Sequence, residues 1–304
     1  MATPAATKAV EQGRESLGLR PPSVQARLRL EFSRNPVNNH TILAESYQEP
    51  PLQVVRAFPQ QDGSALVHLH NVSGGLLGGD HLTQQIHVGR GARVQVTTTG
   101  ATRIYRQRPE CAAATQRNQI MVEANAILEY LPDATIPYAG SRYLQETFVR
   151  LEKGAGLFWW EMISPGREAR GELFQYREFA VKTRITVEGK TITAENLSMQ
   201  PAVREMSSLS RLGNYRYLAT FYVCRAGLEA NAWRGTEDHL REVTSSMTRP
   251  GEILWGVSSL VAHGLAVRCL ARHGREVMPG LQAVWSTAKL HLYGQAAIPP
   301  RKVN

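Results

Sequence analysis

The sequence is poor in cysteine, and this shortage narrows the classes of protein it can encode. The three cysteines, Cys111, Cys224 and Cys269, lie far apart and form no C-x-x-C pair. An odd number of widely spaced cysteines argues against a disulfide framework and against a zinc knuckle. Free cysteines are typical of a reducing cytoplasm, so we expect a cytoplasmic protein.

Long apolar runs are lacking as well. The longest, Ile253–Leu270, contains His263 and Arg268 and is too polar for a membrane span. Residues 1–22 have no continuous apolar stretch of the kind that a secretory signal needs. We predict that residues 1–22 form a disordered N-terminal tail, and we expect no membrane partner.

Known catalytic signatures are missing. The chain contains no G-x-x-x-x-G-K-[ST], no G-x-S-x-G and no H-E-x-x-H. Its glycine-rich stretch, Gly74–Gly79, precedes a strand pattern rather than a helix, so it does not fit a dinucleotide-binding fingerprint. The sequence therefore predicts a protein that is not an enzyme.

Lysine is also scarce, although the net charge is +9 and the pI is about 9.7. There are 29 arginines and six lysines. Arginine makes planar, bidentate contacts with carboxylates, so an arginine-rich surface fits acidic protein at least as well as nucleic acid. The codon bias of a GC-rich genome would produce the same excess.

Alternating apolar and polar residues indicate many short strands. Val24–Phe32 alternates strictly, which is typical of a strand with one buried face. Similar runs follow at intervals of about ten residues. They are Leu52–Phe58, Ala65–His70, Ile86–Val88, Ala92–Thr98, Gln119–Glu123, Ala126–Leu131, Phe148–Leu151, Leu157–Ile163, Lys182–Val187 and Tyr215–Cys224. Short strands without interspersed helices indicate an antiparallel or coiled β architecture.

The pattern changes to helical spacing near the C-terminus. We expect helices over 236–248, over Glu252–Ala271 and over Leu281–Leu292. Strands first and helices last predict an α+β fold that is mostly β. Because no linker or repeat divides the chain, we predict a single domain over 23–304, with a β body at about 23–230 and C-terminal helices at about 236–293.

The segment HNVSGGLLGGD, His70–Asp80, carries the most information. Glycine tolerates φ > 0 and close backbone approach, so paired glycines mark tight turns or bulges. The glycines are Gly74, Gly75, Gly78 and Gly79. They predict a turn that presents Asp80 at the entrance of the next strand.

Four motifs in order carry a resemblance to a known family. GGLLGGD, then a strand and a glycine turn, then TTTGATRIYR, resembles the urease accessory protein UreD family, also called UreH. Leu128–Asp133 resembles the family's Leu-Glu-aromatic-Leu-Pro run, and Glu161 with Gly166–Glu172 resembles its E…GR…GE block. The resemblance covers roughly Leu28 to Leu292.

The resemblance implies a scaffold or chaperone for nickel insertion during urease maturation. Members of this family bind apo-urease and the accessory proteins UreF and UreG, of which UreG is a GTPase. UreE is thought to deliver the nickel. The resemblance also implies a β-helix-like stack of strands followed by C-terminal helices, and an internal polar tunnel as a nickel route. We expect no permanently bound cofactor, only transient nickel.

Six acidic residues fall in or beside the motifs and are candidates for transient nickel contacts. They are Asp80, Glu129, Asp133, Glu161, Glu168 and Glu172. Single carboxylates suit transfer of a cation better than a closed cage does. The alternative role is pairing with arginines such as Arg103, Arg106, Arg167 or Arg170, because a buried acid is costly unless it is paired. Thr97–Thr99 fit either a strand or the wall of a polar passage.

Three other readings remain open at the level of sequence. His68 and His70 lie on one face of a strand, where they could hold a divalent ion with help from Asp80 or His81. Glu168 and Glu172 could form the carboxylate pair of a hydrolase. The basic and aromatic residues of Arg103–Arg108 suit a nucleic-acid-binding β protein. They form one short patch without a recognisable RNA- or DNA-binding module, so we expect no nucleic-acid partner.

Overall fold

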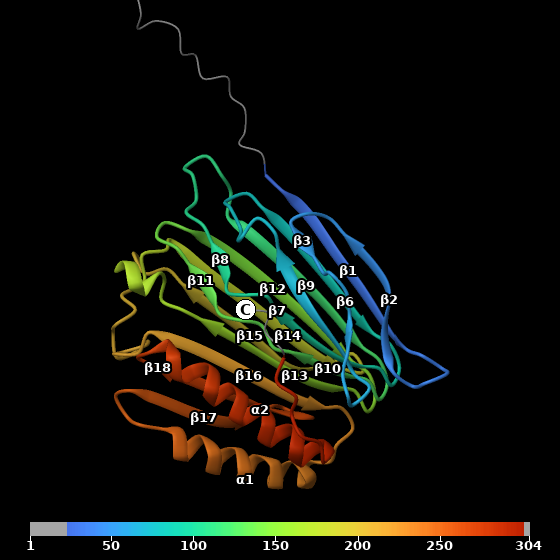
Figure 1. The fold of residues 1–304 in the computed structure, drawn as a ribbon. Helices are drawn as coiled ribbons and strands as arrows, with labels where there is room; N and C mark the ends of the chain where they lie inside the picture. Colours follow the sequence, from blue (N-terminus) through green and yellow to red (C-terminus); the bar gives the residue numbers. More distant parts are fainter. Residues whose placement is uncertain (1–22, 301–304) are drawn as a thin grey trace, which may run out of the picture.

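The structure is a computed structural model that describes residues 23–300. It consists of two β-sheets and a helical layer (Figure 1). The predicted N-terminal tail, 1–22, lies outside the described residues. The seven-stranded sheet has the order β15 (Lys190–Met199), β14 (Glu178–Val187), β12 (Arg142–Leu151), β9 (Ala114–Val122), β6 (His81–Val88), β1 (Gln25–Arg34) and β2 (Thr41–Gln48).

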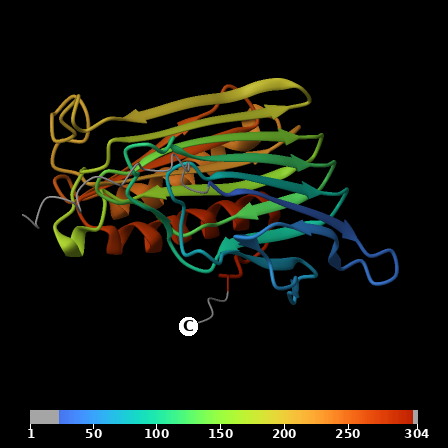
Figure 2. The ribbon, with the colours of Figure 1, turned by 90° about the horizontal axis from the view of Figure 1, so that it is seen from above.

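The second sheet has eleven strands. Its main path is β17 (Ile253–Ser259), β18 (Gly264–Ala271), β16 (Tyr217–Arg225), β13 (Gly156–Ile163), β10 (Ile127–Tyr130), β7 (Arg93–Thr98), β5 (Ala65–Asn71) and β3 (Leu52–Gln53). The short strands β4 (Phe58–Pro59), β8 (Thr102–Ile104) and β11 (Thr135–Pro137) lie beside this path. Figure 2 shows the long strands of the seven-stranded sheet side by side, from yellow (β15) to blue (β1).

The chain passes back and forth between the two sheets, which makes the β body a solenoid. β5, β7, β10 and β13 are parallel neighbours in one sheet, and β1, β6, β9, β12 and β14 are parallel neighbours in the other. Antiparallel strands flank each parallel set. The expectation of an α+β fold, mostly β, with a β-helix-like stack is confirmed.

Alternation along each strand divides the apolar residues between two cores. On β13, Trp159 belongs to the core between the sheets, whereas Trp160 belongs to the core between the eleven-stranded sheet and the helices. Trp160 packs edge-on against Trp285 of the C-terminal helix, with ring centroids 6.1 Å apart. β13 is therefore covered on both faces, and its sequence is a nearly continuous apolar run.

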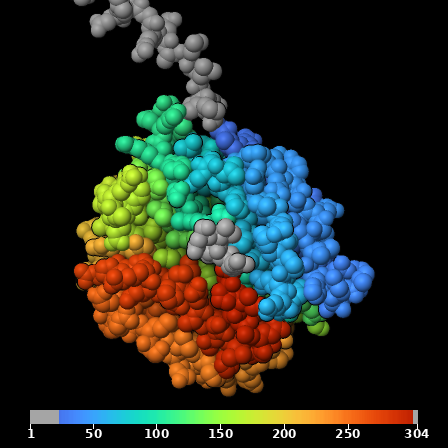
Figure 3. All heavy atoms as spheres, in the orientation of Figure 1, coloured from blue at the N-terminus to red at the C-terminus, as the bar shows by residue number. Residues whose placement is uncertain are grey.

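The helical layer consists of α1 (Ala230–Met247) and α2 (Val277–Tyr293), with short 3₁₀ turns at Glu168–Arg170 and Gly274–Glu276. Both helices lie on the β16–β18 side of the molecule (Figure 1). In the space-filling view, the C-terminal part of the chain (red) lies beside light-blue residues of the N-terminal half (Figure 3). Arg93 of β7 donates to Gln295, just after α2, which joins these two distant parts of the chain.

The helix expected over Glu252–Ala271 is wrong, because this segment is the β17–β18 hairpin. Ile253 and Trp255 alternate towards the helices, and so do Leu265, Val267 and Cys269 on the second strand. A stripe at helical spacing coexisted with this period-two pattern. Pairing of β18 with β16 decided between them, because it completes the edge of the sheet. The sequence patterns did not predict strands β2 and β15, because both are polar strands at the edges of the seven-stranded sheet.

Two helical glycines test how closely α2 packs on the hairpin. A Cβ added at Gly280 of α2 would lie 2.1 Å from the Trp255 indole, whereas one added at Gly235 of α1 would meet nothing within 4 Å. Gly280→Ala should lower the free energy of unfolding by about 1–3 kcal/mol through overpacking. Gly235→Ala should raise it by up to about 1 kcal/mol through helix propensity. Urea denaturation measures both, and equal effects would contradict the packing.

Candidate functional site

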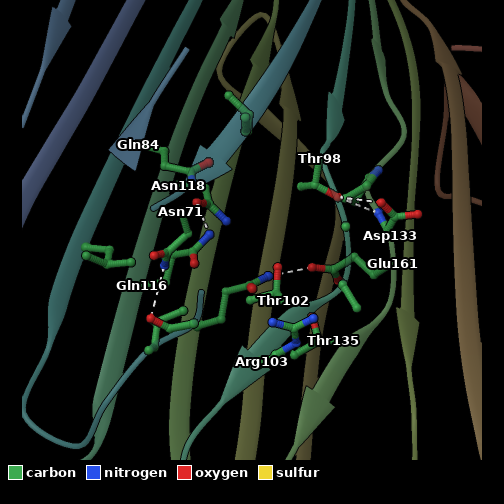
Figure 4. A pocket seen from close by; sticks show the side chains of 18 of the residues that line it. Asn71, Gln84, Thr98, Thr102, Arg103, Gln116, Asn118, Asp133, Thr135 and Glu161 are labelled. Carbon is green, nitrogen blue, oxygen red and sulfur yellow. Dashed lines mark hydrogen bonds between the residues drawn. The ribbon is translucent and has the colours of Figure 1, made fainter. Parts of the chain in front are cut away.

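A polar cavity lies between the two sheets (Figure 4). Its volume is about 250 Å³. The seven-stranded sheet contributes Gln84, Gln116, Asn118 and Gln145, and the other sheet contributes Thr98, Tyr130 and Glu161. Asn71, Gly74 and Arg103 lie at one end of the lining.

Side chains of the seven-stranded sheet form a polar row at inward positions. Gln84, Asn118, Thr147 and Thr183 occupy the same level on four neighbouring strands. All four are buried, and the Asn118 amide donates to the Thr147 hydroxyl at 3.0 Å. Burying an amide in an apolar interior costs free energy unless the amide is hydrogen-bonded. This row therefore needs hydrogen-bond partners inside the β body.

Aromatic hydroxyls extend the network across the cavity. Tyr143 donates to Gln145 at 2.9 Å, and Tyr130 of the opposite sheet donates to Gln84 at 3.3 Å. Burial raises the pKa of both tyrosines above the usual value. They therefore stay protonated and act as hydrogen-bond donors and acceptors.

Glu161 is the acid at the centre of this network. It lies on β13, and its carboxylate accepts from the Gln145 amide at 2.5 Å. Burial raises the pKa of Glu161 to about 7, outweighing the opposing effect of the Gln145 hydrogen bond. Glu161 also lines a second, smaller cavity of about 30 Å³ that includes Glu195 of the edge strand β15. Glu161 thus lines both cavities.

Asp133 is the second predicted acid in the lining. Its backbone N–H donates to the Thr98 hydroxyl at 2.8 Å, and that hydroxyl lies 3.1 Å from the Asp133 carboxylate. Thr98 and Thr99 face the cavity, as expected of a polar wall. Thr97 instead donates to the Leu131 carbonyl at 2.7 Å and is fully buried.

The glycine-rich loop forms part of the cavity wall. Gly74 has φ of +79°, a conformation that other residues rarely adopt. A Cβ at Gly75 would lie 2.4 Å from the Arg103 carbonyl oxygen. The Leu76 N–H donates to the same carbonyl at 2.8 Å, so the loop lies flat against β8. Gly78 and Gly79 complete the turn and lead to Asp80.

Asp80 lies at the entrance of β6, as predicted, but does not line the cavity. Its carboxylate accepts from the backbone N–H groups of Leu77, at 2.8 Å, and Val24, at 3.1 Å. These bonds tie the glycine-rich loop to the start of β1. The arginine partner that we considered from the sequence is replaced by two backbone donors.

Glu129 lies on the opposite face of β10 from the cavity. Its carboxylate contacts the Lys289 ammonium of α2 at 2.5 Å, and both side chains are buried. Burial raises the pKa of Glu129, and Lys289 opposes this effect. Gln95 donates to Glu129 at 3.2 Å and to the Ile298 carbonyl at 2.9 Å. Glu129 thus anchors the C-terminal segment to the sheet.

Glu168 and Glu172 lie in the loop after β13, where each has a basic partner. Glu168 contacts Arg216 at 2.6 Å and accepts from the Tyr217 hydroxyl at 2.7 Å. Burial opposes them, but these hydrogen bonds hold the pKa of Glu168 below its usual value. Glu172 is paired with Arg167, and the hydrogen bond from Arg167 is the main reason why the pKa of Glu172 is also lowered. Two ionised, arginine-paired carboxylates do not suit acid–base hydrolysis.

The two histidines of the predicted pair lie on β5. His68 is buried and packs edge-on against Phe58, while burial and the nearby His68 lower the pKa of His70. Within residues 23–300, no group of three or more His, Cys, Asp or Glu side chains is arranged to hold a metal ion. Neither helix of this part of the chain is long and apolar enough to cross a membrane.

The sequence analysis did not predict the interior amides as site residues. Gln84, Gln116 and Gln145 occupy positions where the alternation of their strands predicts buried apolar side chains. A glutamine in the phase of the buried residues is the signal that could have identified them.

Fold and cavity together define a solenoid-like β scaffold whose interior offers amides, hydroxyls and single carboxylates. A family model described as UreD urease accessory protein matches residues 24–304. The chain belongs to this family.

Individual relatives agree with the family model. The chain is 43% identical to the urease accessory protein UreD of Herpetosiphon aurantiacus over 263 residues, which is 86% of this chain and 91% of the relative. The protein of the same name from Cenarchaeum symbiosum is 32% identical, covering 85% and 90% of the two chains. That of Bacillus sp. (strain TB-90) is 28% identical, covering 90% and 97%.

The raised pKa of Glu161 predicts a pH-dependent stability. Between its ordinary value and about 7, the folded protein binds a proton that the unfolded chain has lost, so stability falls as pH rises through this window. Glu161→Gln removes this loss. The free energy of unfolding of the variant relative to that of wild type should rise by up to roughly 3 kcal/mol as the pH is raised from about 5 to about 8.

Urea denaturation at the two pH values measures this gain. Glu178→Gln is the matched control. A hydrogen bond from Arg142 lowers the pKa of Glu178 below its usual value, so the effect of this group on stability appears only below about pH 5, and the variant should keep the pH dependence of wild type between the two pH values. An unchanged pH dependence in Glu161→Gln would contradict the burial of this carboxyl group.

The two backbone hydrogen bonds of Asp80 predict a structural role. Asp80→Ala leaves the Leu77 and Val24 N–H groups without their acceptor and should cost about 2–4 kcal/mol of stability. Asp80→Asn keeps one acceptor oxygen and should lie between this variant and wild type. Thermal unfolding measures the series; wild-type stability in Asp80→Ala would show that the two bonds contribute nothing.

Proposed function

We propose that this protein serves urease maturation as a scaffold that docks apo-urease to UreF and UreG for GTP-dependent nickel insertion. UreE supplies the nickel in this scheme. Membership of the UreD family supports a role in urease maturation. The named partners come from the resemblance of the sequence to that family.

We further propose that nickel passes through the β body by way of Glu161. The observation that carries this proposal is that Glu161 lines both of the cavities enclosed by the sheets. Asp133 and Thr98 line the larger cavity, and Glu195 lines the smaller one. The oxygen and amide groups that line the two cavities offer a divalent cation several incomplete coordination shells, one after another.

The chemistry of this lining suits transfer rather than storage. A cation held by four strong ligands would not be released into urease, whereas one carboxylate among neutral amides binds weakly. The deprotonated Glu161 is the form that contacts a cation, and a pKa of about 7 lets it gain or lose its proton near neutral pH. Contacts of nickel with Asp80, Glu129, Glu168 and Glu172 stay a prediction. Each of these carboxylates already bonds other groups of the protein.

Coexpression of this protein with urease subunits, the other accessory proteins and nickel tests the passage. Glu161→Gln should leave the yield of the complex with apo-urease unchanged but deprive urease of most of its nickel, because the amide has no negative charge. Nickel per urease active site and complex yield are measured in the same preparation. Glu146→Gln is the matched control, because Glu146 lies on the outer face of β12.

The outcomes separate the two proposals. Full nickel loading with Glu161→Gln would contradict the passage, and loss of the complex would assign Glu161 a structural role. A strain lacking the gene gives the baseline, in which urease subunits are present but inactive and poor in nickel. Normal urease in that strain would contradict the role in maturation itself.

A further inference from the structure

No helix of the described residues covers the outer face of the seven-stranded sheet. Along β1, β6, β9 and β12, every second side chain points away from the cavity and is exposed or only partly buried. Both helices lie against the other sheet (Figure 1). A shallow depression of about 1080 Å³ extends over this face from β1 to β15.

Four arginines from four strands line the depression. They are Arg29 of β1, Arg117 of β9, Arg150 of β12 and Arg184 of β14, and we call them the arginine face. All four are exposed. Arg29 is paired with Glu31. For the other three, no carboxylate among residues 23–300 lies within ion-pair distance.

Acidic residues lie near this face, but none among residues 23–300 forms an ion pair with Arg117, Arg150 or Arg184. Glu152 and Glu188 lie at one end of the depression, and Glu152 accepts from the Ala124 backbone N–H at 2.9 Å. Glu146 lies 3.7 Å from the Lys182 ammonium. Three arginines that make no ion pair within residues 23–300 lie on a concave surface, and such a surface attracts an acidic partner.

The arrangement of the arginines restricts what that partner is. Neighbouring strands lie about 4.8 Å apart, so Arg117 and Arg184, two strands apart, are separated by about 10 Å across the sheet. The Arg117 guanidinium lies over the Phe148 ring, 5.3 Å from its centroid, which holds its fork in place. Separate, oriented guanidinium groups match separate carboxylates, because each accepts a bidentate contact.

We infer that the arginine face docks an acidic segment of a partner protein. A continuous phosphate backbone fits less well, because Glu146 lies in register beside Arg117 and interrupts the positive surface. The Phe148 ring is covered by Arg117 and offers no open platform for base stacking. The inference goes beyond the nickel passage, since the face lies on the opposite side of the sheet from Glu161.

A fluorescein-labelled decaglutamate peptide tests this inference by fluorescence anisotropy at low ionic strength. The full chain should bind the peptide, and Arg117→Glu/Arg184→Glu should weaken binding by about tenfold or more. Arg108→Glu/Arg234→Glu is the matched control. It makes the same change in net charge at exposed arginines of a loop and of α1, and should retain binding.

Each other outcome overturns the inference. These outcomes are no binding of the peptide by wild type, an equal loss in the control, and tighter binding of a single-stranded oligothymidine of matched length at the same salt concentration. Thermal unfolding of both variants checks that they are folded. Exposed positions tolerate such substitutions, so we expect unfolding temperatures close to that of wild type.

Discussion

The burial of amide side chains between the two sheets is the constraint on which the rest of the structure depends. Gln84, Asn118 and Gln145 occupy positions that in most β-sandwiches are apolar. Each must find hydrogen-bond partners, since an unsatisfied buried amide costs about 1–3 kcal/mol. Tyr130 bonds Gln84, Tyr143 and Glu161 bond Gln145, and Thr147 and Gln116 bond Asn118. This hydrogen-bonded network lines the cavity between the sheets.

The period of two along the strands assigns different tasks to the faces of each sheet. Inward positions of the seven-stranded sheet build the polar cavity, while its outward positions carry the arginine face. In the eleven-stranded sheet, Trp159 faces the cavity and Trp160 faces the helices. A shift of one residue in the pairing of a strand would exchange these faces. The strand register therefore determines the cavity, the packing of the helices and the outer surface together.

The sequence predicted those features that depend on local pattern. The strict alternation of Val24–Phe32 predicted β1, and the glycines at 74–79 predicted the turn before β6. It could not place Glu129 beside Lys289, because only the folding of α2 onto β10 brings them together. Ile253–Ala271 fitted both periods, and its pairing with β16 is not a local property. Gln145 was missed because polarity suggested exposure.

Burial and pairing explain why so few of the predicted acids are available for a cation. A buried carboxylate is tolerated when a lysine, an arginine or backbone N–H groups compensate its charge, as they do for Glu129, Glu172 and Asp80. Glu161 lacks such a cationic partner among the described residues and has a neutral amide instead. Its negative form is therefore disfavoured, and a divalent cation in the cavity would stabilise that form by displacing a proton. In the proposed passage, cation binding at Glu161 would therefore release a proton, and a pKa of about 7 would make this exchange reversible near neutral pH.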